Sequence, residues 1–138
     1  MSVFVDTSGL MAVLTAGEEA HAAAAAAWDQ FRSEEHLVTS SYVLAELYAL
    51  VQRRAGMAAL RGLTTDIVPL LEVHWVDNRV HDPAVEALLQ ANRRDLSLVD
   101  CVSFVLMRSL GIRRAFTVDP HFADQGFEVI PSPGPFSV

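Results

Sequence analysis

The sequence predicts an α/β fold with a mostly parallel sheet of about five strands. Two observations lead to this prediction. Short apolar segments alternate with longer segments of helical character from one end of the chain to the other, and this alternation is typical of a parallel sheet covered by helices on both faces. The first segment, residues 2–5, is almost wholly apolar, as expected for a central strand whose two faces are both buried.

The first half of the chain supplies the next elements in order. A short helix is expected at residues 7–14, followed by a helix at 18–32 that is rich in alanine, the strongest helix former. A brief strand at 37–39 precedes a helix at 41–54. Gly56 ends that helix, in the position past a helix C-terminus that glycine commonly takes.

The second half of the chain continues the alternation. The expected elements are a helix at 57–71, a strand at 73–76, a helix from 82 to about 94, a helix at 97–110, and strands at 115–118 and 127–130. Asp82 and Pro83 are expected to open the helix at 82–94, because Asp followed by Pro is an ordinary helix start. Gly111 is expected to close the helix before it.

The length of 138 residues fits one domain, so we expect a single domain over residues 1–138 with an extended, proline-rich tail at 131–138. No apolar run reaches the roughly 18 residues of a membrane span, and the N-terminus lacks the basic start of a signal peptide. Cys101 is the only cysteine and cannot form an internal disulfide. A reducing cytoplasm is therefore the expected location.

The charge of the chain argues against nonspecific binding to duplex nucleic acid. The formal net charge is −7, whereas such binding depends on an excess of basic surface. All ten basic residues are arginine, the side chain that grips phosphate through two parallel hydrogen bonds. Arginine pairs stand at 53–54, 93–94 and 113–114. They are either local phosphate contacts or solvated helix ends.

Four acidic residues are expected at one edge of the sheet. In folds of this kind, ligands bind beyond the carboxyl ends of the strands. Asp6 and Asp119 follow two of the expected strands, and Asp100 lies in the first turn of a helix. Glu46 lies about one turn into the helix that follows the second strand. All four side chains can therefore point to the same place.

The three aspartates also have a simpler structural reading as helix caps. Asp6 and Asp119 are placed to cap the helices that follow them, and Ser97 with Asp100 has the spacing of a capping box. Glu46 lies too far into its helix for capping. Its helical neighbours are largely apolar: Tyr42, Val43, Ala49 and Leu50. A carboxylate on such a face is costly unless a partner or a metal compensates its charge, so Glu46 resists a purely structural explanation.

Clustered carboxylates point to a hard divalent cation. Carboxylates gathered at one point repel one another and raise their own pKa values, and a cation with oxygen ligands removes that penalty. Magnesium is expected rather than zinc, because the five histidines are scattered without the spacing of zinc ligands. Only His121 is expected near the site, and we interpret it as a helix-surface residue.

Four segments resemble the motifs of the PIN-domain ribonucleases in both order and separation. They are residues 3–8 (VFVDTS), 43–46 (VLAE), 95–101 (DLSLVDC) and 116–122 (FTVDPHF). The match spans essentially the whole chain, and within the family the chain is most similar to the VapC-type toxins of toxin–antitoxin pairs. Asp6, Glu46, Asp100 and Asp119 stand at the four acidic positions of the family. Thr117 stands where the family often has a small hydroxyl residue.

The resemblance implies a three-layer α/β/α sandwich and a magnesium-dependent endoribonuclease, with manganese as a substitute. Asp6, Asp100 and Asp119 would hold the metal, and Glu46 would bind it directly or through a water. Thr117 would support the site by a hydrogen bond to a water on the metal. Cleavage of the RNA phosphodiester bond would leave a 5′-phosphate and a 3′-hydroxyl.

The resemblance also implies partners. An antitoxin could insert an arginine among the carboxylates and displace the metal, and a homodimer is expected. The apolar helices over residues 41–71 offer a groove for a helical segment of the antitoxin. Alternatively, these helices only cover the sheet or form the homodimer contact.

Other readings remain open at this point. A phosphatase of the haloacid-dehalogenase type needs a second Asp two residues after the first, where this chain has Ser8. A receiver-type signalling domain needs a late Lys, and the chain has no Lys. A PIN-domain nuclease without an antitoxin is a third reading, and a non-catalytic module that binds RNA or protein on the same fold is a fourth.

Overall fold

The fold is built on a sheet of five parallel strands in the order β3-β2-β1-β4-β5. The computed structural model describes residues 1–132. The strands are β1 (Ser2–Val5), β2 (His36–Ser40), β3 (Glu72–His74), β4 (Arg114–Phe116) and β5 (Glu128–Ile130). Because β1 lies in the centre, the carboxyl ends of β1, β2 and β4 meet at one edge of the sheet. The predicted parallel, five-stranded sheet is confirmed.

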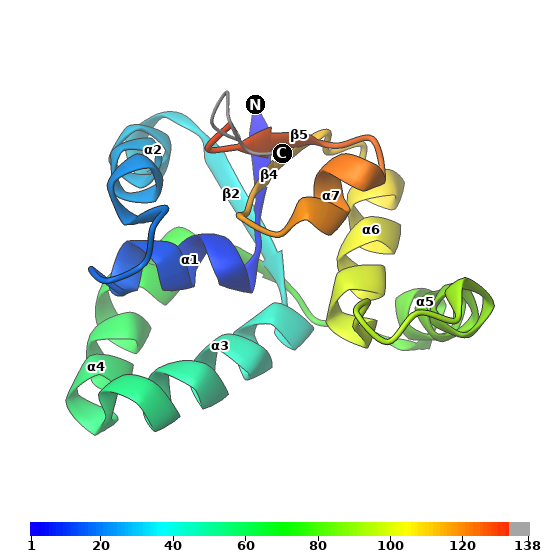
Figure 1. Ribbon diagram of the computed structural model, residues 1–138, viewed down its shortest axis with the longest axis horizontal. Coiled ribbons are helices and arrows are strands. Elements are labelled where there is room, and N and C mark those ends of the chain that lie inside the picture. The colour runs from blue at the N-terminus through cyan, green and yellow to red at the C-terminus, as the bar shows by residue number, and fades with distance from the viewer. Residues whose placement is uncertain (133–138) are drawn as a thin grey trace.

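Helices cover both faces of the sheet, which confirms the three-layer sandwich. They are α1 (Thr7–Leu14), α2 (His21–Glu34), α3 (Ser41–Ala55), α4 (Met57–Gly62), α5 (Asn78–Ala91), α6 (Leu98–Leu110) and α7 (Pro120–Asp124). Figure 1 shows α1 and α2 on one side of the strands and α6 and α7 on the other, with α5 packed outside α6. Within the described residues, no helix has the length and apolar character needed to cross a membrane.

The alternating side chains of β1 explain why two separate cores form. Val3 and Val5 are fully buried in the core that includes Trp28 of α2. Phe4, between them, is fully buried in the second core, together with Phe104 of α6. Successive residues of a strand face opposite sides of the sheet, and burying each large apolar side chain contributes about 1.5–3 kcal/mol. A strand that is apolar throughout is therefore stable only at the centre of a two-sided sheet.

The predicted start of the helix at residues 82–94 is wrong. Helix α5 begins at Asn78, because Asp77 caps it by accepting a hydrogen bond from the backbone N–H of Arg79 at 3.0 Å. Pro83 lies inside the helix rather than at its first position. The proline only removes one backbone donor from the second turn, and the earlier cap decides where the helix begins.

The expected single helix at residues 57–71 is broken. Helix α4 gives way to a π-helical turn, η1 (Leu63–Ile67), and then to a 3-10 turn, η2 (Val68–Leu70). Leu63 and Leu71 are buried in the first core, whereas Met57 and Leu70 are 48% and 43% exposed. Leu63 and Leu71 therefore help to cover the sheet, while other apolar residues of the segment stay exposed, and the predicted antitoxin groove stays a prediction. Residues 133–138 of the predicted tail lie outside the described part of the chain.

Candidate metal centre

Four carboxylates that lie far apart in the sequence line one pocket. Asp6, Glu46, Asp100 and Asp119 all line it, and its volume is about 250 Å³. Asp6 follows β1, Glu46 lies on α3 and Asp100 lies on α6, while Asp119 precedes α7. The structure thus brings together the residues that the sequence placed at one edge of the sheet. Their role as metal ligands stays a prediction.

Asp6 caps α1 and is held by two hydroxyl groups. Its Oδ2 accepts hydrogen bonds from Ser8 Oγ at 2.7 Å and Thr117 Oγ1 at 2.9 Å. The side chain is only 3% exposed. Burial raises the pKa of Asp6 to about 6, although the two hydrogen bonds act in the opposite direction. A carboxylate that is ionised here at neutral pH therefore carries an unfavourable free energy, which a cation would relieve.

A close approach between α1 and β4 fixes where Asp6 lies. The backbone N–H of Asp6 donates to the carbonyl of Phe116 at 3.0 Å. One turn along, Gly9 lies against the same carbonyl, and a Cβ atom on Gly9 would stand 2.5 Å from the Phe116 oxygen. Only glycine allows this approach without displacing the backbone.

Asp100 is held by the capping box that its spacing from Ser97 predicted. The Asp100 backbone N–H donates to Ser97 Oγ at 3.0 Å, and Asp100 Oδ2 accepts from the Ser97 backbone N–H at 3.2 Å. Burial raises the pKa of Asp100, and the nearby charge of Asp119 raises it further. The capping interaction is confirmed, and it orients the carboxylate toward the pocket.

Asp119 caps α7 and is tied to Asp6 through Thr117. Asp119 Oδ1 accepts from the backbone N–H of His121 at 2.9 Å, and the Asp119 backbone N–H donates to Thr117 Oγ1 at 3.0 Å. The Thr117 hydroxyl is thus used inside the protein, and Thr117 does not line the pocket. Its placement supports a role in positioning the two aspartates rather than the predicted bond to a water on the metal. Strand β4 ends at Phe116, so Asp119 follows it after two intervening residues and not directly.

Each aspartate keeps one carboxylate oxygen free. Among residues 1–132, Asp6 Oδ1, Asp100 Oδ1 and Asp119 Oδ2 make no hydrogen bond or ion pair, while the other oxygen of each side chain is anchored. The structure is therefore compatible with both interpretations of these residues, as helix caps and as metal ligands, because one oxygen caps a helix and the other remains available to a ligand.

Glu46 lines the same pocket without a protein partner. Its side chain is half-buried on α3, and it makes no hydrogen bond or ion pair with any residue that the structure describes. The sequence indicated this situation, since the helical neighbours of Glu46 cannot neutralise it. A half-buried carboxylate without a partner among the described residues, beside three others, is best explained by a bound cation or water.

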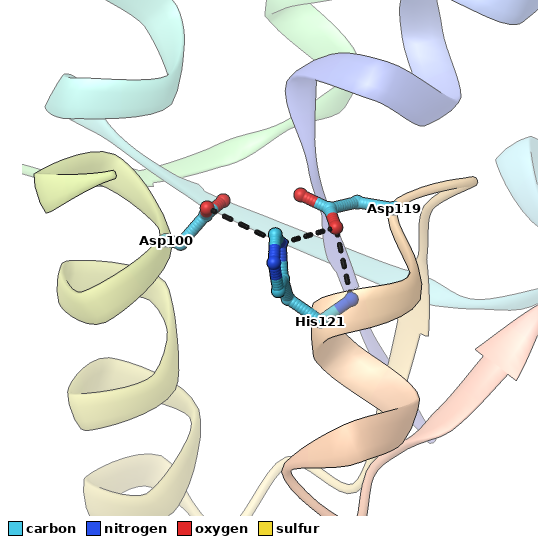
Figure 2. A group of neighbouring side chains, drawn as sticks. All are labelled: Asp100, Asp119 and His121. Carbon is cyan, nitrogen blue, oxygen red and sulfur yellow. Dashed lines mark hydrogen bonds and ion pairs between the residues drawn. The ribbon is translucent and has the colours of Figure 1, made fainter. Parts of the chain in front are cut away.

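The interpretation of His121 as a helix-surface residue is wrong. Figure 2 shows the imidazole between the carboxylates of Asp100 and Asp119. Its side chain is 14% exposed, and Nδ1 lies 2.8 Å from Asp119 Oδ1 and 3.8 Å from Asp100 Oδ2. Burial disfavours a charged ring, but the hydrogen bond to Asp95 and the charges of Asp119 and Asp100 outweigh it, so the pKa of His121 is raised.

The donor atoms present fit a divalent cation. Asp100, Asp119 and His121 each offer one ligand atom, and these atoms lie within 4.8 Å of one another. Asp6 and Glu46 fall outside this tight group but line the same pocket. Within the described part of the chain, the buried His121 Nδ1 makes no hydrogen bond, because its 2.8 Å approach to Asp119 lacks hydrogen-bond geometry. Free carboxylate oxygens beside an unpaired ring nitrogen are the groups that hold such ions.

The sequence model of the PIN-domain family matches residues 3–128 of this chain, and that range contains all four acids. This protein belongs to the PIN-domain family. The predicted resemblance is thereby confirmed, and the four acids of the pocket are the acids of the four matching segments.

The chain is also similar to individual PIN-domain proteins. It is 34% identical over 126 residues to the 23S rRNA-specific endonuclease VapC20 of Mycobacterium tuberculosis, in strains CDC 1551 and H37Rv, covering 91% of this chain and 95% of that protein. The crystal structure of M. tuberculosis VapC20, a Sarcin-Ricin loop cleaving toxin, matches with a TM-score of 0.80 at 33% identity and the same coverage. The structure of FitAcB from Neisseria gonorrhoeae matches with a TM-score of 0.69 at 16% identity over 94% of this chain and 96% of that one, which shows a shared fold alone.

Two residues of this PIN domain escaped the sequence prediction of the site. Ser8 lines the pocket and donates to Asp6, and its position two residues after Asp6 is the signal that would have indicated it. Arg54 also lines the pocket. It lies eight positions after Glu46 on the same helix, so both residues fall on one face of α3.

Proposed function

We propose that this protein is a magnesium-dependent endoribonuclease and the toxin of a toxin–antitoxin pair, acting as a single domain over residues 1–138. The observation that carries the proposal is the pocket in which Asp6, Asp100 and Asp119 each have one carboxylate oxygen anchored and one free. Similarity to an endonuclease that acts on 23S rRNA supports RNA as the substrate.

The charges around the pocket explain why a metal is needed. Among the residues that the structure describes, five acids line it, namely Asp6, Glu18, Glu46, Asp100 and Asp119, against one basic residue, Arg54. A phosphodiester is an anion and would be repelled by this surface. A divalent cation bound by the free oxygens would offset the charges of carboxylates and phosphate and lower the pKa of the attacking water. Magnesium is the first candidate because most of the donors are carboxylate oxygens.

The protein's own groups account for the remaining requirements of hydrolysis. The carboxylate of Glu46 has no competing protein partner among the described residues, so it is free to orient the attacking water and accept its proton. The water oxygen forms a bond to phosphorus and the bond from phosphorus to the 3′-oxygen breaks, with a proton passing to that oxygen. The products are a 5′-phosphate and a 3′-hydroxyl.

Arg54 supplies the only cation among the side chains that line the pocket in the described structure. A guanidinium donates two parallel hydrogen bonds to a phosphate group. We expect Arg54 to hold a phosphate next to the bond that is cleaved. Such a contact would allow an anionic phosphate to bind at the pocket although the net charge of the chain is −7.

An antitoxin fits the same pocket by its charge. In the proposed pairing, an arginine of the antitoxin enters among the carboxylates and displaces the cation. The toxin assignment is supported by similarity to VapC20, which is named a toxin. A homodimer and a cytoplasmic location, where RNA substrates lie, belong to the same proposal.

Cleavage of RNA with and without Mg²⁺ tests this proposal. Purified protein is incubated with a 23S rRNA loop oligonucleotide and with an unrelated RNA, and the end groups of the products are determined. We expect cleavage with Mg²⁺, none with EDTA, and none by Asp100→Asn, whose neutral amide still completes the capping box. Asp82→Asn, on the surface helix α5, is the matched control and should cleave normally. Cleavage by Asp100→Asn at the parent rate, or cleavage that survives EDTA, contradicts the proposal, and no cleavage by the parent favours the non-catalytic reading.

A further inference from the structure

His121 is held from both sides of its ring. The ring nitrogen Nε2 lies 3.2 Å from Asp95 Oδ2, and the other nitrogen faces the pocket carboxylates. Asp95 is itself fixed by Arg93, whose Nε and Nη2 donate to its two oxygens at 3.1 Å and 2.7 Å. Arg93 holds the pKa of Asp95 well below its usual value, with His121 adding to the effect, so Asp95 is a carboxylate that only accepts hydrogen bonds.

The contact with Asp95 decides which nitrogen of the His121 ring faces the carboxylates of Asp100 and Asp119. Because Asp95 only accepts, the hydrogen in the His121–Asp95 hydrogen bond lies on Nε2, and Nδ1 is the ring nitrogen that faces the carboxylates of Asp100 and Asp119. Nδ1 is buried, makes no hydrogen bond to any residue that the structure describes, and lies 2.8 Å and 3.8 Å from oxygens of Asp119 and Asp100. Nδ1 beside two carboxylates is stable only with a positive charge there, which is either a proton on the ring or a metal ion in place of that proton. A carboxylate behind the ring and a metal in front of it is the usual arrangement of a histidine ligand.

We propose that His121 Nδ1 is a ligand of the divalent cation held by Asp100 and Asp119, with Asp95 as the residue that positions the ring. The proposal rests on the proposed function, since it adds a ligand to that metal site. It has a chemical consequence. Imidazole binds transition metals in preference to magnesium, whose ligands are oxygens, so the site should select Mn²⁺ over Mg²⁺.

The distances are compatible with this role. Ligand atoms about 2.1 Å from an octahedral ion lie about 3 Å apart when adjacent. Nδ1 lies 2.8 Å and 3.8 Å from Asp119 Oδ1 and Asp100 Oδ2, the anchored oxygens, and one ligand atom of each of the three side chains lies within 4.8 Å of the others. Side-chain rotation would therefore bring Nδ1 and the free carboxylate oxygens to one ion. His121 also has no alternative hydrogen-bond partner for Nδ1 among residues 1–132. The competing reading is that the ring is a fixed counter-charge that never touches the metal.

Electron spin-echo spectroscopy of bound Mn²⁺ distinguishes these readings, because a directly coordinated nitrogen produces a characteristic ¹⁴N coupling. The full-length protein, His121→Asn, Asp95→Asn and Asp100→Asn are each loaded with Mn²⁺, and the affinities for Mn²⁺ and Mg²⁺ are measured by calorimetry. His74→Asn is the control, since His74 also faces a carboxylate, Glu72 at 3.2 Å, but is not part of the group formed by Asp100, Asp119 and His121.

We expect the ¹⁴N coupling in the parent and in His74→Asn, and its loss in His121→Asn. His121→Asn should lower Mn²⁺ affinity roughly tenfold or more, and Asp95→Asn should weaken it while keeping the coupling. Mg²⁺ affinity should change much less. Absence of the coupling in the parent, or its persistence in His121→Asn, overturns the proposal. If this proposal is overturned but Asp100→Asn still weakens Mn²⁺ binding, the proposed metal-dependent function stands. If Asp100→Asn leaves Mn²⁺ binding unchanged as well, the proposed function also fails.

Discussion

Thr117 Oγ1 lies 2.9 Å from Asp6 Oδ2, although 111 positions separate the two residues in the chain. The same hydroxyl accepts a hydrogen bond from the backbone N–H of Asp119. One small side chain directly after β4 therefore ties together the first and last acids of the pocket. The geometry of the candidate metal centre depends on this link as well as on the caps of the individual helices.

Replacing Thr117 tests the link. Thr117→Val keeps the shape of the side chain but removes the donor to a buried carboxylate, and a hydrogen bond to a charged group contributes about 1.5–3 kcal/mol. We expect the free energy of unfolding in urea at pH 7 to fall by about that amount. Thr117→Ser keeps the hydroxyl and should lose clearly less. Equal stability of the Val variant and the parent would show that the bond to Asp6 has no structural role.

The raised pKa of Asp6 predicts how stability depends on pH in metal-free protein. Burial raises this pKa from 3.8 to about 6, so the folded state binds the proton more tightly than the unfolded state. Stability is therefore highest below about pH 4 for this group and falls as the pH rises to about 6, by about 3 kcal/mol. Asp6→Asn removes that dependence, because the amide does not ionise.

The measurement is thermal unfolding of Asp6→Asn and the parent in EDTA. At pH 7 the variant should be the more stable protein, and at pH 4 the difference should disappear. Saturating Mg²⁺ should stabilise the parent and have little effect on the variant. A variant that is less stable than the parent at pH 7 without metal would mean that the ionised carboxylate carries no burial penalty.

Gly9 allows α1 to approach β4, and its replacement should be costly. In Gly9→Ala, the new Cβ would stand 2.5 Å from the Phe116 carbonyl oxygen, so the helix must move, at a cost of about 1–3 kcal/mol. Gly62→Ala is the matched control, since Gly62 is also helical and its nearest neighbour would be 4.0 Å away. The control should be stabilised by about 0.5–1 kcal/mol. Opposite shifts in Tm are expected, and a shift of Gly9→Ala in the stabilising direction would refute the close contact.

Arg54 and Arg53 offer a paired test of RNA binding. Both are exposed arginines on α3, but only Arg54 lines the pocket. Arg54→Gln should raise the KM for RNA cleavage about tenfold, in keeping with about 1.5 kcal/mol for a lost charged hydrogen bond, while kcat changes less. Arg53→Gln should leave both constants near the parent values. Equal effects of the two substitutions would indicate a diffuse electrostatic contribution rather than a phosphate contact at the pocket.

The sequence predicted the sheet and the four acids because both depend on local patterns. An apolar run such as residues 2–5 has only one stable place in an α/β fold, and a polar residue directly after such a strand has to lie at the edge of the sheet. Asp6 could be placed in this way, and Asp119 lies close to the end of β4, whereas Asp100 was placed by its position in the first turn of a helix. Glu46 was identified because its helical neighbours offer it no partner.

Contacts between residues that lie far apart in the chain could not be predicted from the sequence. His121 was read as a surface residue because the loop that carries Asp95 comes 26 positions earlier, and nothing local shows that the two meet. Residues 57–71 read as one helix because their composition favours one, whereas burial of Leu63 and Leu71 in the first core accompanies a break into π-helical and 3-10 turns. The start of α5 was misplaced because Asp82 and Pro83 compete with an equally ordinary cap at Asp77.

The most direct test of the whole account is an anomalous difference map from crystals of the full-length protein soaked in Mn²⁺, with data collected at the manganese absorption edge. The account predicts a strong peak in the pocket, within bonding distance of free carboxylate oxygens of Asp6, Asp100 or Asp119. A map with no peak there, or with its strongest peak elsewhere on the molecule, would contradict the claim that these carboxylates converge to hold a divalent cation.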